Sequence, residues 1–457
     1  MIQPPQQITL SQWDACAEID EALPDYCGPL SRHVCDGDTR LTSLLFDNGV
    51  ASFRLWNFLL TEEARLYAAR ASGHTLVGTM KDLGTVPVMA YSLKHVTAFY
   101  PDGAWWIPCV MELGAGLLKI ADDLGVDESF CPVRAMLGAF VSEAHFPRPD
   151  LLTCSVGAVC DDFSAIAQRL EALGHDILWW DMPHRRTPDP GEEGVILPGG
   201  SVAPVSQVRQ VTSELGRVRQ ALETHTGQSL DEDALKVGIA RANEVRRLLE
   251  QLREGAYGAS VCPLPALEML IAEMLAIHFC SDLDETTAVL KGLVDLVHTR
   301  VHAGLGYGTR DTPGVFWVNP VADLRVMNLL EQCGARVCGT EYLFSHALDP
   351  IPEDLPPMEA LARMALADPM VGSAQDRADR ICRDVQRFGA QAVIISRIPG
   401  ASHCALEGQI IGETVKTRLG LPVLEIEIPP LTDAMAPSIR TRIEALVEVV
   451  KSQNLEI

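Results

Sequence analysis

Short apolar runs alternate with amphipathic segments through the first half of the chain. The runs at residues 74–80 and 177–183, and the stretch that starts at residue 150, predict buried strands. Apolar positions at the helical period predict a helix at 111–124 and another that begins near Asp161. Strands and helices that alternate in this way indicate a parallel sheet with crossover helices.

The same alternation returns in the last third, after a long helical region. The middle of the chain shows helical spacing at residues 208–222, 231–254 and 264–276. In the last third, apolar runs predict strands and amphipathic patterns predict helices, the strands at 314–319, 334–341, 391–396 and 421–427 and the helices at 323–333, 374–388, 406–419 and 438–450. The segment rich in proline and acidic residues before residue 374 is expected to be a loop.

These patterns predict an α/β fold with two doubly wound parallel-sheet halves joined by a helical segment. We expect a helical N-terminal extension at residues 1–72, a first α/β domain at 73–200, a helical middle segment at 201–305 and a second α/β domain at 306–457. A chain of 457 residues is long for one hydrophobic core, which agrees with this division.

The composition narrows the classes of function. Acidic residues outnumber Lys and Arg by 61 to 37, which gives a net charge of −24, so nucleic acid is not an expected partner. No apolar run reaches the roughly 20 residues that span a bilayer, and the first residues lack the pattern of a secretory signal. We therefore expect no membrane contact and a cytoplasmic location, in which the 13 cysteines stay reduced.

Cys160 has the most informative local setting of these cysteines. It follows the strand that starts near residue 150 and precedes a helix whose first turn carries Asp161 and Asp162. A thiol at a helix N-terminus lies near positive partial charge, which favours the thiolate that binds metals. Cys160 is therefore either a structural thiol or one ligand of a metal site.

Cys131 and Cys404 share this setting, because each lies in a loop that opens a helix. Pro132 directly follows Cys131 and suits the first helical position, and Cys160 and Cys404 both follow predicted parallel strands. Ligands collect outside the carboxyl ends of such strands, so the three thiols are expected to converge at a cleft between the halves. Three thiolates on a cubane-type iron–sulfur cluster would leave its fourth iron open.

Spacing alone leaves other interpretations open. The three cysteines lie far apart in the sequence and form no CxxC run, so three buried thiols without a metal are one alternative. A zinc site that uses His403 or His346 with cysteines is another. The glycine-rich segment 304–308 lacks a strand before it and a helix after it, so we expect a turn there and no phosphate-binding loop.

The order of several short motifs resembles that in the cluster-bearing subunits of 2-hydroxyacyl-CoA dehydratases and benzoyl-CoA reductases. The motifs of the first half are Val77-Gly-Thr79, Cys131-Pro-Val-Arg-Ala-Met-Leu-Gly138, Pro149-Asp-Leu-Leu152 with Cys160-Asp161, and Trp180-Asp-Met-Pro183. Those of the second half are Gly334-Ala-Arg-Val337, the strand before Cys404, Gly420-Leu-Pro-Val-Leu-Glu-Ile-Glu427 and Arg440-Thr-Arg-Ile-Glu-Ala445. Each motif is weak by itself, but their order and spacing together are specific.

The resemblance implies one [4Fe–4S] cluster, held by Cys131, Cys160 and Cys404. Cys154 is the rival of Cys160, which bears the Cys-Asp pair of the family at the helix start. The resemblance also implies a homologous second subunit, in a heterodimer or a larger complex, and a separate ATP-hydrolysing iron–sulfur activator. The chain contains no GxxxxGK[ST] motif, as expected if the activator hydrolyses the ATP.

The activity implied by the resemblance is ATP-dependent chemistry on an acyl-CoA thioester. In the dehydratases a ketyl radical allows a 2-hydroxyl group to leave, and in the reductases an aromatic ring is reduced. A double-cubane reductase, which would need further cysteines such as Cys27 and Cys35, and a non-catalytic electron-transfer or assembly subunit stay open. The catalytic base is unassigned, although Glu341, Arg310 and Ser402 lie at expected loop positions.

Overall fold

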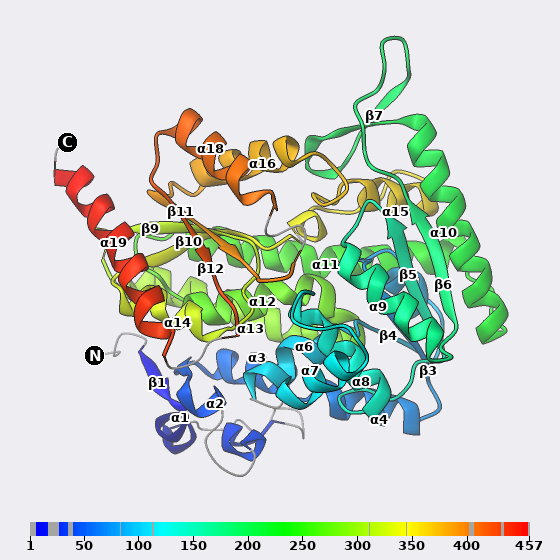
Figure 1. Ribbon diagram of the computed structural model, residues 1–457, viewed down its shortest axis with the longest axis horizontal. Helices are drawn as coiled ribbons and strands as arrows, with labels where there is room; N and C mark the ends of the chain where they lie inside the picture. Colours follow the sequence, from blue (N-terminus) through cyan, green and yellow to red (C-terminus); the bar gives the residue numbers. More distant parts are fainter. Residues whose placement is uncertain are drawn as a thin grey trace.

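The computed structural model describes residues 6–16, 27–34, 40–82, 84–111, 114–309, 311–343, 345–401, 406–430 and 434–455. It confirms the α/β fold with two parallel-sheet halves. Each half contains a four-stranded sheet in which all neighbouring strands run parallel, with helices packed around it (Figure 1).

The first sheet has the strand order β4-β3-β5-β6. Its strands are β3 (Thr75–Met80), β4 (Val96–Phe99), β5 (Leu151–Gly157) and β6 (Ile177–Met182). The helices of this half are α5 (Val86–Tyr91), α6 (Gly103–Val110), α7 (Gly114–Asp123), α8 (Ala135–Ser142) and α9 (Asp161–Ala172). The carboxyl end of β5 leads directly into the loop that ends at Cys160.

The second sheet has the strand order β10-β9-β11-β12. Its strands are β9 (Gly314–Val318), β10 (Arg336–Glu341), β11 (Ala392–Arg397) and β12 (Val423–Glu427). The helices of this half are α14 (Arg325–Gln332), α15 (Pro357–Leu366), α16 (Ala374–Arg387), α18 (Gly408–Leu419) and α19 (Ala436–Leu455). The predicted strands at 314–319, 334–341, 391–396 and 421–427 are confirmed, with ends that differ by at most two residues.

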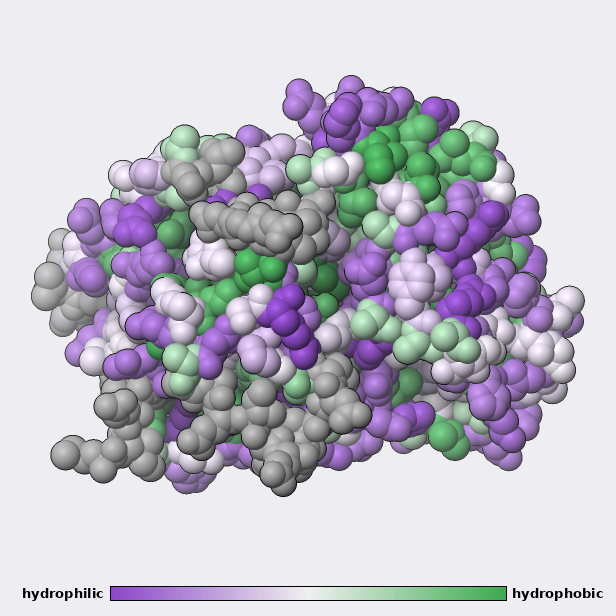
Figure 2. All heavy atoms as spheres, turned by 90° about the horizontal axis from the view of Figure 1, so that it is seen from below, coloured by the Kyte–Doolittle hydropathy of each residue, from purple (hydrophilic) through white to green (hydrophobic). Residues whose placement is uncertain are grey.

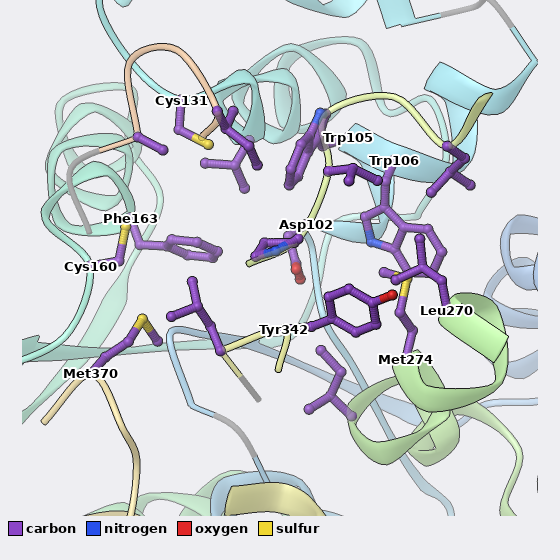
Figure 3. A pocket seen from close by; sticks show the side chains of 18 residues that line it. Asp102, Trp105, Trp106, Cys131, Cys160, Phe163, Leu270, Met274, Tyr342 and Met370 are labelled. Carbon is purple, nitrogen blue, oxygen red and sulfur yellow. The ribbon is translucent and has the colours of Figure 1, made fainter. Parts of the chain in front are cut away.

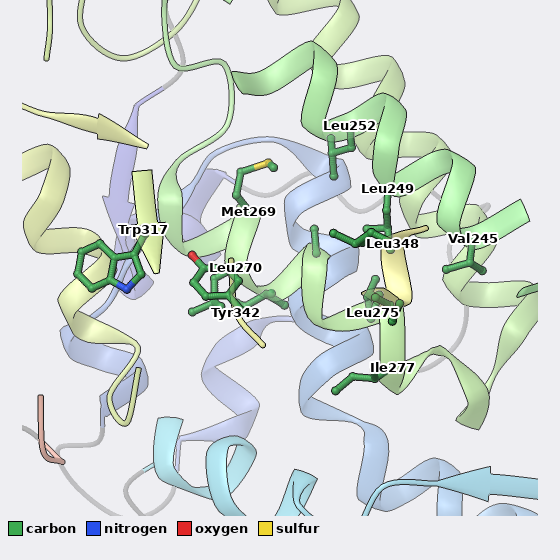
Figure 4. Close-up of a cluster of buried hydrophobic side chains, with 14 of the residues drawn as sticks. Val245, Leu249, Leu252, Met269, Leu270, Leu275, Ile277, Trp317, Tyr342 and Leu348 are labelled. Atoms are coloured by element: carbon green, nitrogen blue, oxygen red, sulfur yellow. The ribbon is translucent and has the colours of Figure 1, made fainter. Parts of the chain in front are cut away.

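Long helices form the middle of the chain and connect the two halves. They are α10 (Val205–Thr226), α11 (Glu232–Tyr257), α12 (Ala266–His278) and α13 (Leu283–Ala303). Buried side chains of α11 and α12 belong to the same hydrophobic cluster as Trp317 of β9 (Figure 4). The same hydrophobic cluster contains Val77 of β3 and Ile394 of β11, so one continuous core reaches both sheets.

The N-terminal residues pack against the middle helices. Their described elements are β1 (Gln7–Thr9), α1 (Leu10–Cys16), α2 (Arg40–Ser43), β2 (Leu45–Asp47), α3 (Val50–Leu60) and α4 (Glu62–Ala71). The antiparallel pair of β1 and β2 was not predicted, because three-residue strands are too short to show an alternating pattern. Ion pairs of Arg54 with Glu285 (2.6 Å) and of Asp47 with Arg300 (2.7 Å) tie this region to α13.

Polar residues cover much of one face of the molecule, and a hairpin projects from its body. Hydrophilic residues spread over the face seen in Figure 2, with hydrophobic residues in smaller groups between them. The hairpin of β7 (Gly194–Ile196) and β8 (Val202–Pro204) extends away from the body of the molecule (Figure 1). None of the helices in the described ranges is long and apolar enough to cross a membrane.

Some elements differ from the predictions for identifiable reasons. A loop was expected before residue 374, but α15 lies within that segment, and Pro357 occupies its first position, where a backbone N–H is not needed. The helix α5 was not predicted, because all of its residues are buried and no polar positions mark a helical period. The domain boundaries at residues 72, 200 and 305 stay predictions.

Glu331 on α14 is a buried carboxyl group whose ionisation the fold opposes. Its residue is 3% exposed, Oε1 accepts a hydrogen bond from the backbone N–H of Ala266 (2.8 Å), and Oε2 has no partner among the described residues. Burial raises the pKa of Glu331 from 4.5 to about 8, although the Ala266 amide acts in the opposite direction.

This raised pKa predicts a pH-dependent loss of stability. Between pH 4.5 and about 8 the unfolded chain ionises Glu331 while the folded chain keeps its proton, so the free energy of unfolding falls as the pH rises. We expect Glu331→Gln to flatten this dependence by up to about 1.4 kcal/mol per pH unit. Urea unfolding across that pH range measures the slope, and the exposed Glu448→Gln is the control. Parallel curves for the wild type and Glu331→Gln would contradict the prediction.

Candidate metal centre

A cavity of about 160 Å³ lies where the two halves meet α12 (Figure 3). Much of its wall follows the carboxyl ends of parallel strands: Asp102 comes after β4, Cys160 after β5, Val321 after β9, Tyr342 after β10 and Ile398 after β11. Loops from both sheets therefore converge on one site, as is usual for ligand sites in open α/β sheets.

Cys131 occupies the start of a short helix on this wall. It is the residue before the 3-10 helix Pro132–Arg134, which continues into α8, and it is 7% exposed. Its backbone N–H donates a hydrogen bond to Oδ1 of Asp162 (3.3 Å). The predicted helix-capping position of Cys131 is confirmed, and it places the thiol on the cavity wall.

Cys160 is the residue before α9 and also lines the cavity. Its Sγ lies 3.6 Å from Oδ2 of Asp162, so the carboxylate of Asp162 contacts both Cys160 and the backbone of Cys131. Burial, followed by the charge of Asp162, raises the pKa of the Cys160 thiol to about 11. The amides at the start of α9 lower this pKa, as expected for a helix N-terminus, but burial has the larger effect in the protein without a metal.

Cys154 lies in a different environment. It is a fully buried residue of β5, and its thiol donates to the backbone carbonyl of Ser155 (3.3 Å). Burial raises its pKa to about 12, and it is not among the residues that line the cavity. Cys131 and Cys160 thus share one wall, of which Cys154 is not a part, although Cys131 and Cys154 belong to the same hydrophobic cluster.

A comparison with known families identifies the family to which the chain belongs. Residues 99–450 match the family described as 2-hydroxyglutaryl-CoA dehydratase, D-component. The chain belongs to this family. It is a component of the 2-hydroxyacyl-CoA dehydratase type, and the match includes Cys131, Cys160 and Cys404. No curated protein matches the sequence.

The donor set of this dehydratase component is compatible with an iron–sulfur cluster. Two thiols from separate helix starts face one apolar cavity, and thiolates are the usual ligands of such clusters. Cys404, the third predicted ligand, lies outside the described residues. Within the described ranges, no three or more His, Cys, Asp or Glu side chains are grouped as a metal ion would require.

None of the other residues that the sequence suggested as functional, as far as the structure describes them, lines the cavity. Arg310, Ser402 and His403 lie outside the described residues, and the side chain of His346 is not described. Glu341 is 1% exposed and pairs with the buried Arg377, so its role here is structural. The segment 304–308 forms a turn at the end of α13, as predicted.

The remaining wall of the cavity was not predicted from the sequence. Trp106 and Tyr342 lie across the cavity from Cys160, and the ring of Phe163 points into it (Figure 3). Asp102 is a partly buried acid on this wall, and its buried Oδ1 has no hydrogen-bond partner among the described residues. Burial raises the pKa of Asp102, which favours its protonated form.

A basic group also lies close to the thiols. Lys81 directly follows β3 with a left-handed φ of 63°, and its Nζ donates to Oγ of Ser164 in α9 (3.1 Å). Burial lowers the pKa of Lys81, whereas the nearby Cys154 and Cys160 raise it. The only sequence signal for Lys81 is its position at the carboxyl end of a predicted strand.

Proposed function

We propose that this chain is the iron–sulfur component of an ATP-dependent 2-hydroxyacyl-CoA dehydratase, with one [4Fe–4S] cluster held by Cys131, Cys160 and Cys404. The observation that supports this most is that Cys131 and Cys160 line one apolar cavity in a chain of this family. Three protein thiolates would leave one iron of the cluster open to substrate.

The residues just before Cys404 support it as the third ligand. Ala401 lines the same cavity as Cys131. Gly400 has a φ of 79°, and a Cβ added there would lie 2.6 Å from the backbone of Phe130, so this close approach requires glycine. The chain that leads to Cys404 therefore packs directly against the residue that precedes Cys131.

The cavity wall suits the acyl end of a CoA thioester. A bound cluster would supply single electrons at low potential to the thioester carbonyl. Trp105, Phe163 and Tyr342 contribute apolar surface that keeps water away from a reactive acyl group. Burial raises the pKa of Asp102, which favours the protonated form, and we propose it as the acid–base group of the site.

The description of the family as a D-component supports a larger assembly. We propose a homologous second subunit, and a separate iron–sulfur activator that hydrolyses ATP and passes electrons to this chain. The chain has no GxxxxGK[ST] motif of its own, so ATP hydrolysis is assigned to the activator.

The aromatic wall favours benzoyl-CoA reduction as the second candidate function. Trp105, Trp106, Phe163 and Tyr342 all line the cavity. A flat aryl group packs well against such rings in offset or edge-on arrangements. Dearomatising reduction of benzoyl-CoA at the same cluster is therefore the alternative reaction.

Metal analysis tests the proposed cofactor. We expect anaerobically purified protein to be brown and to contain about four iron atoms and about four sulfides per chain. Iron and sulfide assays with visible absorption spectroscopy measure this, and protein reconstituted with zinc serves as the control. A colourless, iron-free protein under these conditions would contradict the proposal.

Turnover assays then separate the candidate reactions. The chain is combined with its second subunit, the activator and ATP, and supplied with 2-hydroxyacyl-CoA thioesters or with benzoyl-CoA. Dehydration of a 2-hydroxyacyl-CoA supports the first function, and reduction of benzoyl-CoA alone supports the second. Iron binding without turnover of any thioester would assign the chain to electron transfer.

A further inference from the structure

A second, larger cavity lies away from the cysteines, between α11 and α16. Its volume is about 520 Å³, within the range of roughly 300–1,000 Å³ typical of small-ligand sites. Among the described residues, its lining contains a group of arginines: Arg246, Arg247, Arg253, Arg380, Arg383 and Arg387. In a chain with a net charge of −24, this concentration of guanidinium groups is unusual.

Some of these arginines have carboxylate partners. Arg253 pairs with Glu273 (2.6 Å), Arg380 pairs with Asp349 (2.7 Å), and Arg387 pairs with Glu250 and Glu254. Only the pairs of Arg387 join α16 to α11, and none of these pairs needs a ligand. They involve two of the carboxylates that line the cavity, Glu250 and Asp349, and the third, Asp384, lies near Arg253, Arg380 and Arg387, whose charges lower its pKa against the effect of burial.

The other arginines form no ion pair with a carboxylate of the described chain. Arg247 and Arg383 are exposed at the cavity, and Arg383 donates only to the backbone carbonyl of Gly199 (3.4 Å). Once Arg246 is included, three of the six arginines therefore lack a carboxylate ion pair in the described part of the chain.

Arg246 is the residue that most requires an explanation. It is 1% exposed, its Nη1 donates to the carbonyl oxygen of Asp349 (2.6 Å), and its Nε and Nη2 have no partner within the described part of the chain. A buried guanidinium without a counter-charge is costly, and burial accordingly lowers the pKa of Arg246 to about 10. Its Nη2 lies against Gly84 and its unpaired atoms are closed to solvent, so Arg246 adds positive charge behind the cavity wall, while the exposed Arg247 and Arg383 are the groups that can contact an anion.

We propose that the cavity between α11 and α16 binds a small molecule through its phosphate groups, at a site separate from the cysteine cavity. Arginine is the residue best suited to this task, because its planar group makes paired hydrogen bonds to phosphate oxygens. All the basic side chains that line the described cavity are arginines. The phosphate belongs either to a free nucleotide or diphosphate, or to the phosphorylated end of a CoA compound.

Titration calorimetry on the full chain, prepared without an iron–sulfur cluster, tests the proposed phosphate site. The probes are inorganic pyrophosphate, ADP and CoA, each at constant ionic strength, with chloride as the reference anion. We expect saturable binding of at least one probe. The double variant Arg247→Ala/Arg383→Ala should weaken it at least about tenfold, since each charge-assisted hydrogen bond contributes about a tenfold factor.

Arg241→Ala is the matched control. Arg241 lies on the same helix α11, is partly exposed, and pairs with Asp284 outside the cavity. Its replacement should leave binding of the probes unchanged. Competition between CoA and pyrophosphate would identify the CoA end as the ligand, and binding of pyrophosphate or ADP without CoA would identify a free phosphate compound.

Two results would overturn the proposal. One is the absence of saturable binding for all three probes, and the other is binding that is equal in the wild type and the double variant. Because the measurement uses protein without a cluster, neither result bears on the iron content or on the proposed function.

Discussion

Cys160→Ser is expected to remove most of the iron from anaerobically purified protein. Cys160 lines the cavity together with Cys131, and a serine hydroxyl of nearly the same size is a poor cluster ligand because it ionises far less readily than a thiol. Iron should fall from about four atoms per chain to less than about one. Iron and sulfide assays measure this, and circular dichroism checks that the fold is kept.

Cys154→Ser is the matched control for this experiment. Cys154 is fully buried in β5 and does not line the cavity, so a hydroxyl there is expected to cost about 1–3 kcal/mol of stability through an imperfectly paired polar group. The iron content should nevertheless stay at the wild-type level. Full iron in Cys160→Ser together with iron loss in Cys154→Ser would show that the ligand assignment is wrong.

The sheets could be predicted from the sequence because their strands carry strong local signals. β3, β5 and β11 are continuous apolar runs that end in turns, as expected for strands buried on both faces of a parallel sheet. The elements that were missed lack such signals. β4 has four residues, and α15 lies in a segment whose prolines suggested a loop.

Only those features of the site that depend on neighbouring residues in the sequence could be predicted. Cys131 and Cys160 stand at helix starts, and the sequence shows this directly. Asp102 and Tyr342 come to the cavity from different strands of different sheets, and no spacing in the sequence relates them. Burial, which outweighs the helix-start effect on the Cys160 pKa, is likewise a property of the folded chain.

Arg377 links Glu407, which follows Cys404 in the sequence, to the second sheet. It is 1% exposed on α16, and its Nε donates to Oε2 of Glu341 at the end of β10 (3.1 Å). Its Nη1 donates to Oε2 of Glu407 (2.7 Å), three residues after Cys404. Arg377 therefore fixes one end of the segment that holds the third proposed ligand, while Gly400 fixes the other end against the backbone near Cys131.

Arg377→Ala is expected to cost about 3–5 kcal/mol of stability, because it leaves the buried carboxylate of Glu341 without its partner. The milder Glu407→Gln keeps the Arg377–Glu341 pair, so it should retain most of the stability while it loosens the segment before α18. If Arg377 positions that segment, the iron content of Glu407→Gln falls although its melting temperature stays near that of the wild type.

Arg418→Ala provides the matched control for these variants. Arg418 pairs with Asp379 on the same helix as Arg377, but both side chains are nearly half exposed, and such surface pairs contribute about 0–1 kcal/mol. We expect wild-type stability and iron content in this variant. Thermal unfolding and iron assays on all the variants separate the contribution of Arg377 to stability from its contribution to positioning the segment before α18. Wild-type iron content in Glu407→Gln would show that Arg377 stabilises the second sheet without positioning the cysteine segment.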